Sequence, residues 1–256
     1  MVNDISSEYV KTELQKGVAN IEFFHPQSNS LPGKILHDLA AAITHAGENP
    51  DALVIVLRSA GEKAFCAGAS FDELAAIKNE KEGLEFFSGF AYVINAMRTC
   101  PKFILGRIHG KCVGGGVGLA AAVDYAIATG GAEVKLSELA IGIGPFVVGP
   151  AVERKIGVAA FTALAIDATG WRNAEWGKRK GLFAEVHDSI GNLDEAVYRL
   201  ADHLSHSSPQ AMAEMKKIFW KGTEHWDTLL TERAKISGRL VLSEFTRNAI
   251  AKFKAK

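Results

Sequence analysis

The chain has 256 residues, 48% of them hydrophobic, which suits one large domain or two small ones with a sizeable buried core. Lys and Arg together number 29, as do Asp and Glu, so no bulk charge favours nucleic acid or an anionic membrane as a partner. Three widely spaced cysteines without a CxxC pair argue against a zinc site, and the sequence shows neither a signal peptide nor a membrane span, so we expect a cytoplasmic protein without a metal.

The first part of the chain alternates between strand and helix patterns. Residues 9–26 predict a hairpin with a Lys-Gly turn. Residues 32–46 predict a helix that carries Ile35, Leu39 and Ile43 on one face. Residues 51–60 form a continuous apolar run, which is typical of a strand covered on both faces.

The alternation continues toward the middle of the chain. Residues 84–99 predict a second long helix, and residues 102–110 and 124–129 predict two more buried strands. Strands and helices of these lengths favour βαβ units in a mostly parallel sheet. Helical patterns dominate beyond about residue 150. We therefore expect an α/β core over residues 1–195 and a helical region over residues 196–256.

The segment GKCVGGGVGLAAAVD, residues 110–124, contains an unusual run of glycines. One interpretation is a dinucleotide-binding turn, because Gly116, Gly118 and Ala121 fit G-x-G-x-x-A and Glu138 follows at a suitable distance. Against it, residues 109–113 separate the glycines from the predicted strand, and about a hundred residues precede a motif that normally opens its domain.

A second interpretation is a site for a negatively charged oxygen. Glycines let a ligand approach the main chain closely, and the first N–H groups of a helix are unpaired and partly positive. Such groups stabilise charge that develops on an oxygen during a reaction. A second donor is expected from GEKAFCAGASFDEL, residues 61–74, where small residues again join a predicted strand to a helix. A tight turn that only packs a helix closely is the purely structural alternative.

Several segments together resemble the crotonase superfamily, the enoyl-CoA hydratases and isomerases. They are EKAFCAGASFDEL, IHGKCVGGGVGLAAAVDYAIAT, KLSELAIGIGP and WGKRKGLFAEV, and the resemblance is densest over residues 52–145. It implies an α/β fold with a ClpP/crotonase-type ββα spiral core and a helical C-terminal trimerisation region. It also implies an acyl-CoA substrate, no separate cofactor, and a homotrimer or a dimer of trimers.

The resemblance also implies roles for individual residues. The backbone N–H groups of Ala69 and Gly115 would hold the thioester oxygen, and Glu138 would be the acid–base group, although Ser137 stands where the family usually has proline. The apolar residues around Glu138 (Leu136, Leu139 and Ile141) predict a partly desolvated carboxyl with a raised pKa. The expected substrate contacts are Ala67, Gly68, Ser70, Gly114, Gly118, Pro145, Phe146, Phe253 and Lys256.

One departure from the family pattern bears on the reaction. Hydratases of the family carry a second glutamate where this chain has Gly118. A single carboxylate favours isomerisation, because it can take a proton from one carbon and return it to another, and the segment GIGPFVVGP also resembles the loop of Δ3,Δ2-enoyl-CoA isomerases. The alternatives are hydration of a short or branched enoyl-CoA, decarboxylation of an acyl-CoA, a non-catalytic relative that binds acyl-CoA or RNA, and a nicotinamide-dependent oxidoreductase.

Other reactive side chains are expected to be structural. Cys66 lies beside the first small-residue loop without a visible His-Asp context, and His109 ends a predicted strand. The four tryptophans are predicted to be core residues. Asp72 occupies a position where hydratases often place a CoA-contacting lysine, so we expect that contact to be absent.

Overall fold

The computed structural model describes the backbone of residues 7–254 and the side chains of residues 7–252. Its main sheet has six strands in the order β1-β2-β4-β7-β9-β12, and all neighbours are parallel except β1 and β2. The mostly parallel sheet predicted from the sequence is therefore confirmed. The strands are β1 (Tyr9–Gln15), β2 (Val18–Phe24), β4 (Val54–Ser59), β7 (Ile104–Ile108), β9 (Tyr125–Thr129) and β12 (Glu185–His187).

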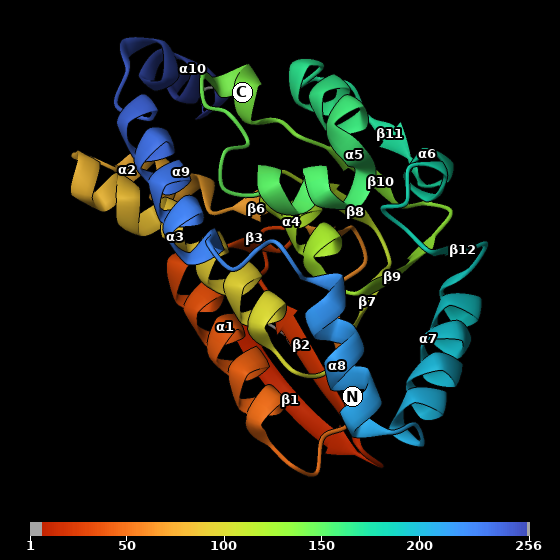
Figure 1. The fold of residues 1–256 in the computed structure, drawn as a ribbon. Helices are drawn as coiled ribbons and strands as arrows, with labels where there is room; N and C mark the ends of the chain where they lie inside the picture. Colours follow the sequence, from red (N-terminus) through yellow and green to blue (C-terminus); the bar gives the residue numbers. More distant parts are fainter. Residues whose placement is uncertain (1–6, 255–256) are drawn as a thin grey trace.

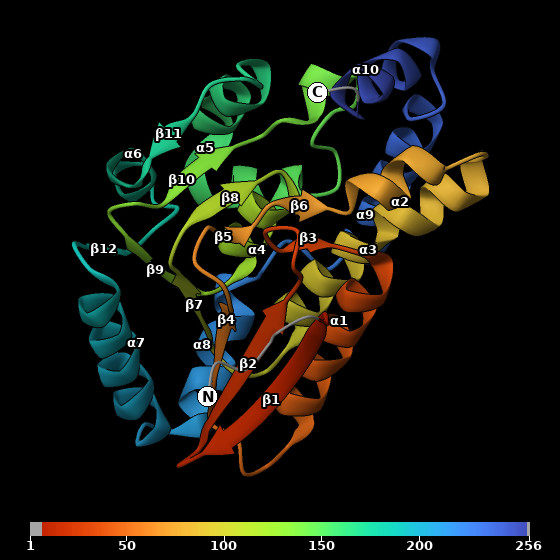
Figure 2. The same cartoon turned by 180° about the vertical axis from the view of Figure 1, so that it is seen from behind.

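The predicted hairpin forms from β1 and β2, at one edge of this sheet (Figure 2). Lys16 and Gly17 make the two-residue turn, with φ angles of 50° and 78°. Two positive φ angles match the twist of the flanking strands, and glycine adopts such an angle without strain.

Helices cover both faces of the main sheet. Val54 and Val56 of β4 lie in an apolar cluster with α7 (Ile190–Ser205), whereas Ile55 and Leu57 of the same strand point into the main core. On that core side lie α1 (Gly33–Glu48) and α3 (Glu80–Thr99) (Figure 1). The prediction that residues 51–60 form a strand covered on both faces is confirmed.

The long helices carry the expected apolar faces. Ile35, Leu39 and Ile43 of α1 are fully buried. Helix α3 begins earlier than the predicted residue 84, because the Asn79 side chain accepts a hydrogen bond from the Glu82 N–H at 3.0 Å and caps the helix at Glu80.

Two small sheets that the sequence analysis did not predict lie beside the main sheet. One has the order β11-β10-β8-β5, and the other pairs β3 with β6. They consist of β3 (Ser30–Leu31), β5 (Ala64–Cys66), β6 (Gly68–Ala69), β8 (Lys111–Val113), β10 (Glu133–Lys135) and β11 (Arg172–Asn173). These short strands position the start of α4 (Gly115–Ala122) and the 3-10 turn η1 (Glu138–Ile141).

The remaining helices are α2 (Phe71–Ala76), α5 (Gly149–Ile166), α6 (Ala174–Arg179), α8 (Pro209–Phe219), α9 (Trp226–Leu240) and α10 (Glu244–Lys254). Helix α9 packs on α3, and α10 packs on η1 (Figure 1). The expected boundary between residues 195 and 196 falls inside α7, which covers the main sheet and so belongs by packing to the α/β body. A trimerisation role for the helices beyond it stays a prediction.

A buried ion pair ties α8 to the core. Lys216 Nζ lies 2.9 Å from Asp124 Oδ2, and the Trp220 indole N–H donates to Asp124 Oδ1 at 3.0 Å. Trp220 and Trp226 are buried, as predicted, whereas Trp171 is only half-buried, with Lys111 and Lys135 over its ring. Within residues 7–254, no helix is long and apolar enough to cross a membrane.

Candidate active site

Two glycine-containing loops from different sheets meet at the candidate site. A Cβ atom placed on Gly68 would lie 3.1 Å from the Val113 carbonyl oxygen and 3.7 Å from the Gly115 nitrogen. A Cβ atom placed on Gly116 would lie 2.2 Å from the Cys66 carbonyl oxygen. Side chains at these positions would push the loops apart, so glycine is what lets the strand carrying Ala69 approach the start of α4.

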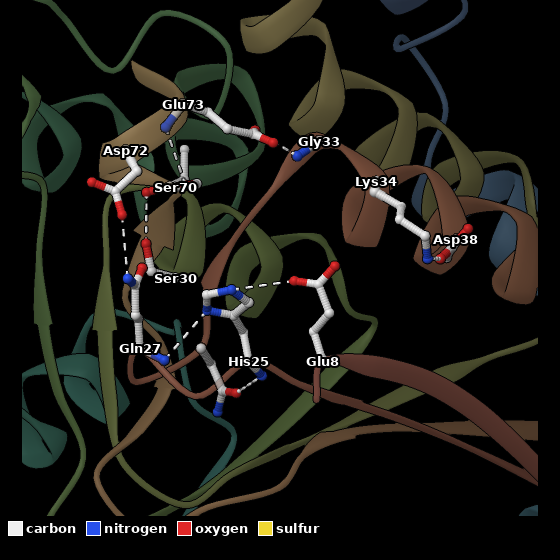
Figure 3. A network of polar contacts seen from close by, with 12 residues as sticks. Glu8, His25, Gln27, Ser30, Gly33, Lys34, Asp38, Ser70, Asp72 and Glu73 are labelled. Carbon is white, nitrogen blue, oxygen red and sulfur yellow. Dashed lines mark hydrogen bonds and ion pairs between the residues drawn. The ribbon is translucent and has the colours of Figure 1, made fainter. Parts of the chain in front are cut away.

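Two hydrogen bonds fix the peptide group that joins Ala69 to Ser70. The Ser70 N–H donates to the Leu31 carbonyl at 2.9 Å. The Ser30 hydroxyl donates to the Ala69 carbonyl at 2.9 Å (Figure 3). Successive amides of a strand point to opposite edges. The Ala69 N–H therefore points away from β3, which makes it a suitable donor to a ligand.

Helix α2 holds this strand in place through its own first turn. The Ser70 hydroxyl caps α2 by accepting a hydrogen bond from the Glu73 N–H at 3.3 Å. The Glu73 carboxylate in turn accepts from the Gly33 N–H at 2.8 Å, and Gln27 donates to Asp72 at 3.3 Å (Figure 3). Ser70, predicted as a substrate contact, is thus a buried helix cap.

The second donor lies at the first position of α4. Gly114 has φ 50° and ψ −112°, a conformation that favours glycine, and Gly115 begins the helix. The Gly114 N–H donates to the Lys135 carbonyl at 2.9 Å, which fixes the turn against β10. The N–H of Gly115 belongs to the first turn, where amides have no partner within the helix and carry partial positive charge.

The Glu138 carboxyl lies directly beside this turn. A Cβ atom placed on Gly114 would lie 3.0 Å from Glu138 Oε1, so the missing side chain of Gly114 makes room for the carboxyl rather than for substrate. Oε2 is buried, and no residue within 7–252 hydrogen-bonds to it. Burial raises the pKa of Glu138 to about 7, and a hydrogen bond from its own backbone N–H only partly offsets this.

The surroundings of Glu138 differ in one respect from the expectation. Leu136 is buried, but Leu139 is 50% exposed. The four-residue turn of η1 carries Leu139 to the surface, while the Gly114 main chain takes its place against the carboxyl. The predicted rise in the pKa of Glu138 is nevertheless present, and burial of the carboxyl is its largest cause.

The position of the missing second glutamate is filled by another element. A Cβ atom placed on Gly118 would lie 2.5 Å from Val148 Cγ1 and 2.7 Å from Val148 Cβ. Val148 is buried and immediately precedes α5. The start of α5 therefore packs on α4 at the position where a glutamate side chain at residue 118 would leave the main chain. Any side chain at position 118 would have to displace Val148.

The dinucleotide interpretation does not fit these contacts. The strand β8 does precede the turn directly, contrary to the gap expected from the sequence. However, Gly116 faces the Cys66 carbonyl and Gly118 faces Val148, so protein atoms occupy both glycine faces that a pyrophosphate would need.

The other expected substrate contacts vary in position. The Ala67 N–H donates to the Asn29 carbonyl at 3.1 Å, which makes it part of the loop's internal bonding. Pro145 and Phe146 are half-buried in the segment between η1 and α5. Phe253 lies in α10 with a side chain outside the described residues, and Lys256 lies outside them altogether. Contact of any of these residues with a substrate stays a prediction.

The structural interpretation of Cys66 and His109 is supported. Cys66 is fully buried, and burial raises the pKa of its thiol to about 12, which suppresses the nucleophilic thiolate. His109 is 7% exposed, and burial together with Arg107 and Arg58 lowers its pKa to about 4. Among residues 7–252, no group of three or more His, Cys, Asp or Glu side chains could hold a metal ion.

Two neighbours of the glycine turn escaped the sequence analysis. Phe90 of α3 lies against Gly115, and Val148 lies against Gly118. In the sequence each is one apolar residue among many, and no local spacing connects either to the glycines. Only the packing of α3 and α5 on α4 brings them to the site.

Comparisons with known proteins identify the family of this chain. A family model described as enoyl-CoA hydratase/isomerase matches residues 13–252. A probable enoyl-CoA hydratase of Bacillus subtilis is 28% identical over 246 residues, which cover 93% of each protein. The peroxisomal Delta(3,5)-Delta(2,4)-dienoyl-CoA isomerase of Arabidopsis thaliana is 27% identical over 77% of this chain and 74% of its own length.

The fold is also that of a solved relative. The crystal structure of an enoyl-CoA hydratase from Bacillus halodurans superposes with a TM-score of 0.88 at 23% identity, covering 95% of this chain and 99% of that one. Since the family model spans nearly the whole sequence and the architecture agrees, the chain belongs to the enoyl-CoA hydratase/isomerase family of the crotonase superfamily.

Proposed function

We propose that this protein isomerises an enoyl-CoA, moving a double bond from position 3 to position 2 of the acyl chain. The Ala69 and Gly115 N–H groups hold the thioester oxygen while it carries negative charge, and Glu138 is the single acid–base group. Coenzyme A enters as part of the substrate, and the reaction uses no separate cofactor or metal.

The observation that carries this proposal is the contrast between Glu138 and Gly118. The Glu138 carboxyl is buried beside the turn of α4 with a pKa of about 7, which suits a group that both accepts and returns a proton near neutral pH. At Gly118, where a hydratase of the family would carry a second carboxylate, Val148 fills the space.

The proposed reaction has two proton transfers. Glu138 removes a proton from C2 of the 3-enoyl thioester. The electron pair of that C–H bond forms the C1–C2 double bond, and the π pair of the C1–O double bond moves onto the oxygen to give an enolate. The two N–H donors stabilise the charge on the thioester oxygen. The enolate then collapses: the C1–O double bond re-forms, the C1–C2 pair becomes the C2–C3 double bond, and the C3–C4 pair takes the proton from Glu138 at C4. No atom is gained or lost.

The test compares two reactions of the wild-type protein. We expect a 3-enoyl-CoA to be converted to the 2-enoyl-CoA about 10²–10⁴-fold faster than a 2-enoyl-CoA is hydrated, because that is the usual contribution of one acid–base group. Rates are followed by the absorbance of the conjugated thioester and by chromatography of the products.

Efficient hydration would instead support a hydratase in which another group supplies the second proton path. Turnover only of a carboxylated acyl-CoA would support a decarboxylase. Tight acyl-CoA binding without turnover of any of the three substrates would support the non-catalytic alternative.

A further inference from the structure

The Phe90 ring occupies the space that a side chain on Gly115 would need. A Cβ atom placed on Gly115 would lie 2.1 Å from Phe90 Cζ, and 2.4 Å and 2.5 Å from the two adjoining ring carbons. The tip of the ring therefore points at the α-carbon of Gly115 and touches it. Phe90 itself is only 5% exposed and belongs to the main core.

The other glycines of the turn have different neighbours. Gly114 faces the Glu138 carboxyl, Gly116 faces the Cys66 carbonyl, and Gly118 faces Val148. The Gly114–Gly115 unit is thus bordered by the reactive carboxyl on one side and by an aromatic ring on the other. The Phe90 phenyl ring is the largest of these neighbours, and Phe90 can be replaced by a smaller residue without changing a catalytic group.

An acyl group held at the Gly115 N–H would lie next to the residue whose α-carbon this ring contacts. The donor nitrogen is bonded to the α-carbon that the ring touches, and the reacting carbon must lie within reach of Glu138, beside Gly114. An acyl chain that extends toward α3 meets the tip of Phe90. Interiors are close-packed, so a longer chain cannot enter on this side unless the ring moves.

We propose that Phe90 is the wall that limits the size of the acyl group, so that the wild-type site takes short-chain enoyl thioesters and discriminates against long ones. This inference rests on the proposed function of the same site. It assigns a specificity role to a residue of α3 without giving that residue a part in proton transfer.

The test measures binding rather than turnover, so that it does not depend on which reaction the site performs. Titration calorimetry with butanoyl-CoA and decanoyl-CoA gives the ratio of the two dissociation constants for each variant. We expect wild type to bind butanoyl-CoA at least about 10-fold more tightly, because even one methylene that does not fit a pocket costs about 10-fold or more. Phe90→Leu should reduce the ratio about 10-fold, and Phe90→Trp should increase it.

Val93→Ala is the matched control. Val93 is fully buried in α3, in the same core cluster, so this variant also shortens a core side chain of the helix. We expect its ratio to stay within about twofold of wild type, since a general loosening of the core does not select for chain length. Thermal unfolding shows which variants are folded, and Phe90→Met, which conserves volume but bends easily, replaces Phe90→Leu if the latter does not fold.

The outcomes separate the two proposals. If the ratio of the two dissociation constants is unchanged in a folded Phe90→Leu or Phe90→Met variant, Phe90 does not limit the size of the acyl group. The same conclusion follows if Val93→Ala changes this ratio equally. A wild type that binds neither thioester overturns the proposed function, and the wall falls with it.

Discussion

At the scale of single residues, the protonation state of the Glu138 carboxyl controls the predicted proton transfer. A base must be ionised, and the pKa of this carboxyl is raised to about 7 from 4.5. We expect kcat/KM for the isomerisation to rise with pH through about 7 and then to level off.

Glu138→Gln should lower kcat about 10²–10⁴-fold and retain acyl-CoA binding, because the amide keeps the size of the carboxyl but cannot carry the proton.

The raised pKa of Glu138 also makes the free energy of unfolding depend on pH. The folded protein holds the Glu138 proton up to about pH 7, whereas the unfolded chain loses it near pH 4.5. The folded state binds more protons between these values, so the free energy of unfolding falls as pH rises through this window. Chemical denaturation at pH 5 and pH 8 should show a smaller fall for Glu138→Gln. An equal fall in both proteins would contradict the assigned pKa.

The role of the Gly115 amide is testable only without adding a side chain, because a Cβ atom would strike the Phe90 ring. An ester bond in place of the amide, introduced as glycolic acid at position 115, removes the N–H and adds no bulk. We expect kcat to fall about 10²–10³-fold, the usual cost of one oxyanion donor. The same ester at the exposed Gly131 is the control. Near-normal turnover of the folded position-115 ester would exclude Gly115 as a donor.

At the scale of elements, the crossing of α4 and α5 explains why the second carboxylate cannot simply be restored. A Cβ atom at position 118 would lie 2.5 Å from Val148 Cγ1 and 2.7 Å from its Cβ. Overpacking of this kind costs about 1–3 kcal/mol. We expect Gly118→Ala to destabilise the protein by about that amount in chemical denaturation, and Gly118→Ala with Val148→Gly to recover much of the loss.

The control is the Val148→Gly single variant, which shows whether the effects of Gly118→Ala and Val148→Gly on the free energy of unfolding add. Val148→Gly alone should also be destabilising, because it leaves a cavity between the helices. The two single effects should therefore not add in the double variant. Strict additivity would mean that α4 and α5 do not touch at these residues.

At the scale of the whole molecule, exposed apolar side chains remain on the helices of the C-terminal half. Ile218 of α8 is 70% exposed and Phe245 of α10 is 67% exposed. Apolar side chains that are exposed on the surface of a single chain suit contacts between subunits. We therefore predict a homotrimer or a dimer of trimers formed through this region, with Phe245→Glu weakening the assembly.

Light scattering coupled to size exclusion at micromolar concentration measures the mass. Leu14→Glu is the control: Leu14 is 43% exposed on β1, outside the helices of the C-terminal half, and this change should leave the mass unchanged. A wild-type mass of one chain would contradict the prediction.

The sequence by itself determined the elements whose pattern is local. The hairpin, the helix with Ile35, Leu39 and Ile43, and the buried strand at 54–59 follow from periodicity and from the Lys-Gly turn. The roles of Ala69, Gly115 and Glu138 are predictions that rest on the resemblance of the motifs to the crotonase superfamily. The strands of two or three residues were missed, since such a short segment shows no period.

Only the tertiary structure decided what each glycine of the turn contacts. Gly114 accommodates the Glu138 carboxyl, Gly115 accommodates Phe90, and Gly118 accommodates Val148, and these partners lie 24 to 30 residues away in the sequence. The pKa of Glu138 depends on packing as well, because burial of the carboxyl raises it, although Leu139, its apolar neighbour in sequence, is 50% exposed. Local sequence sets backbone preference, but burial and steric contact depend on which distant segments pack together.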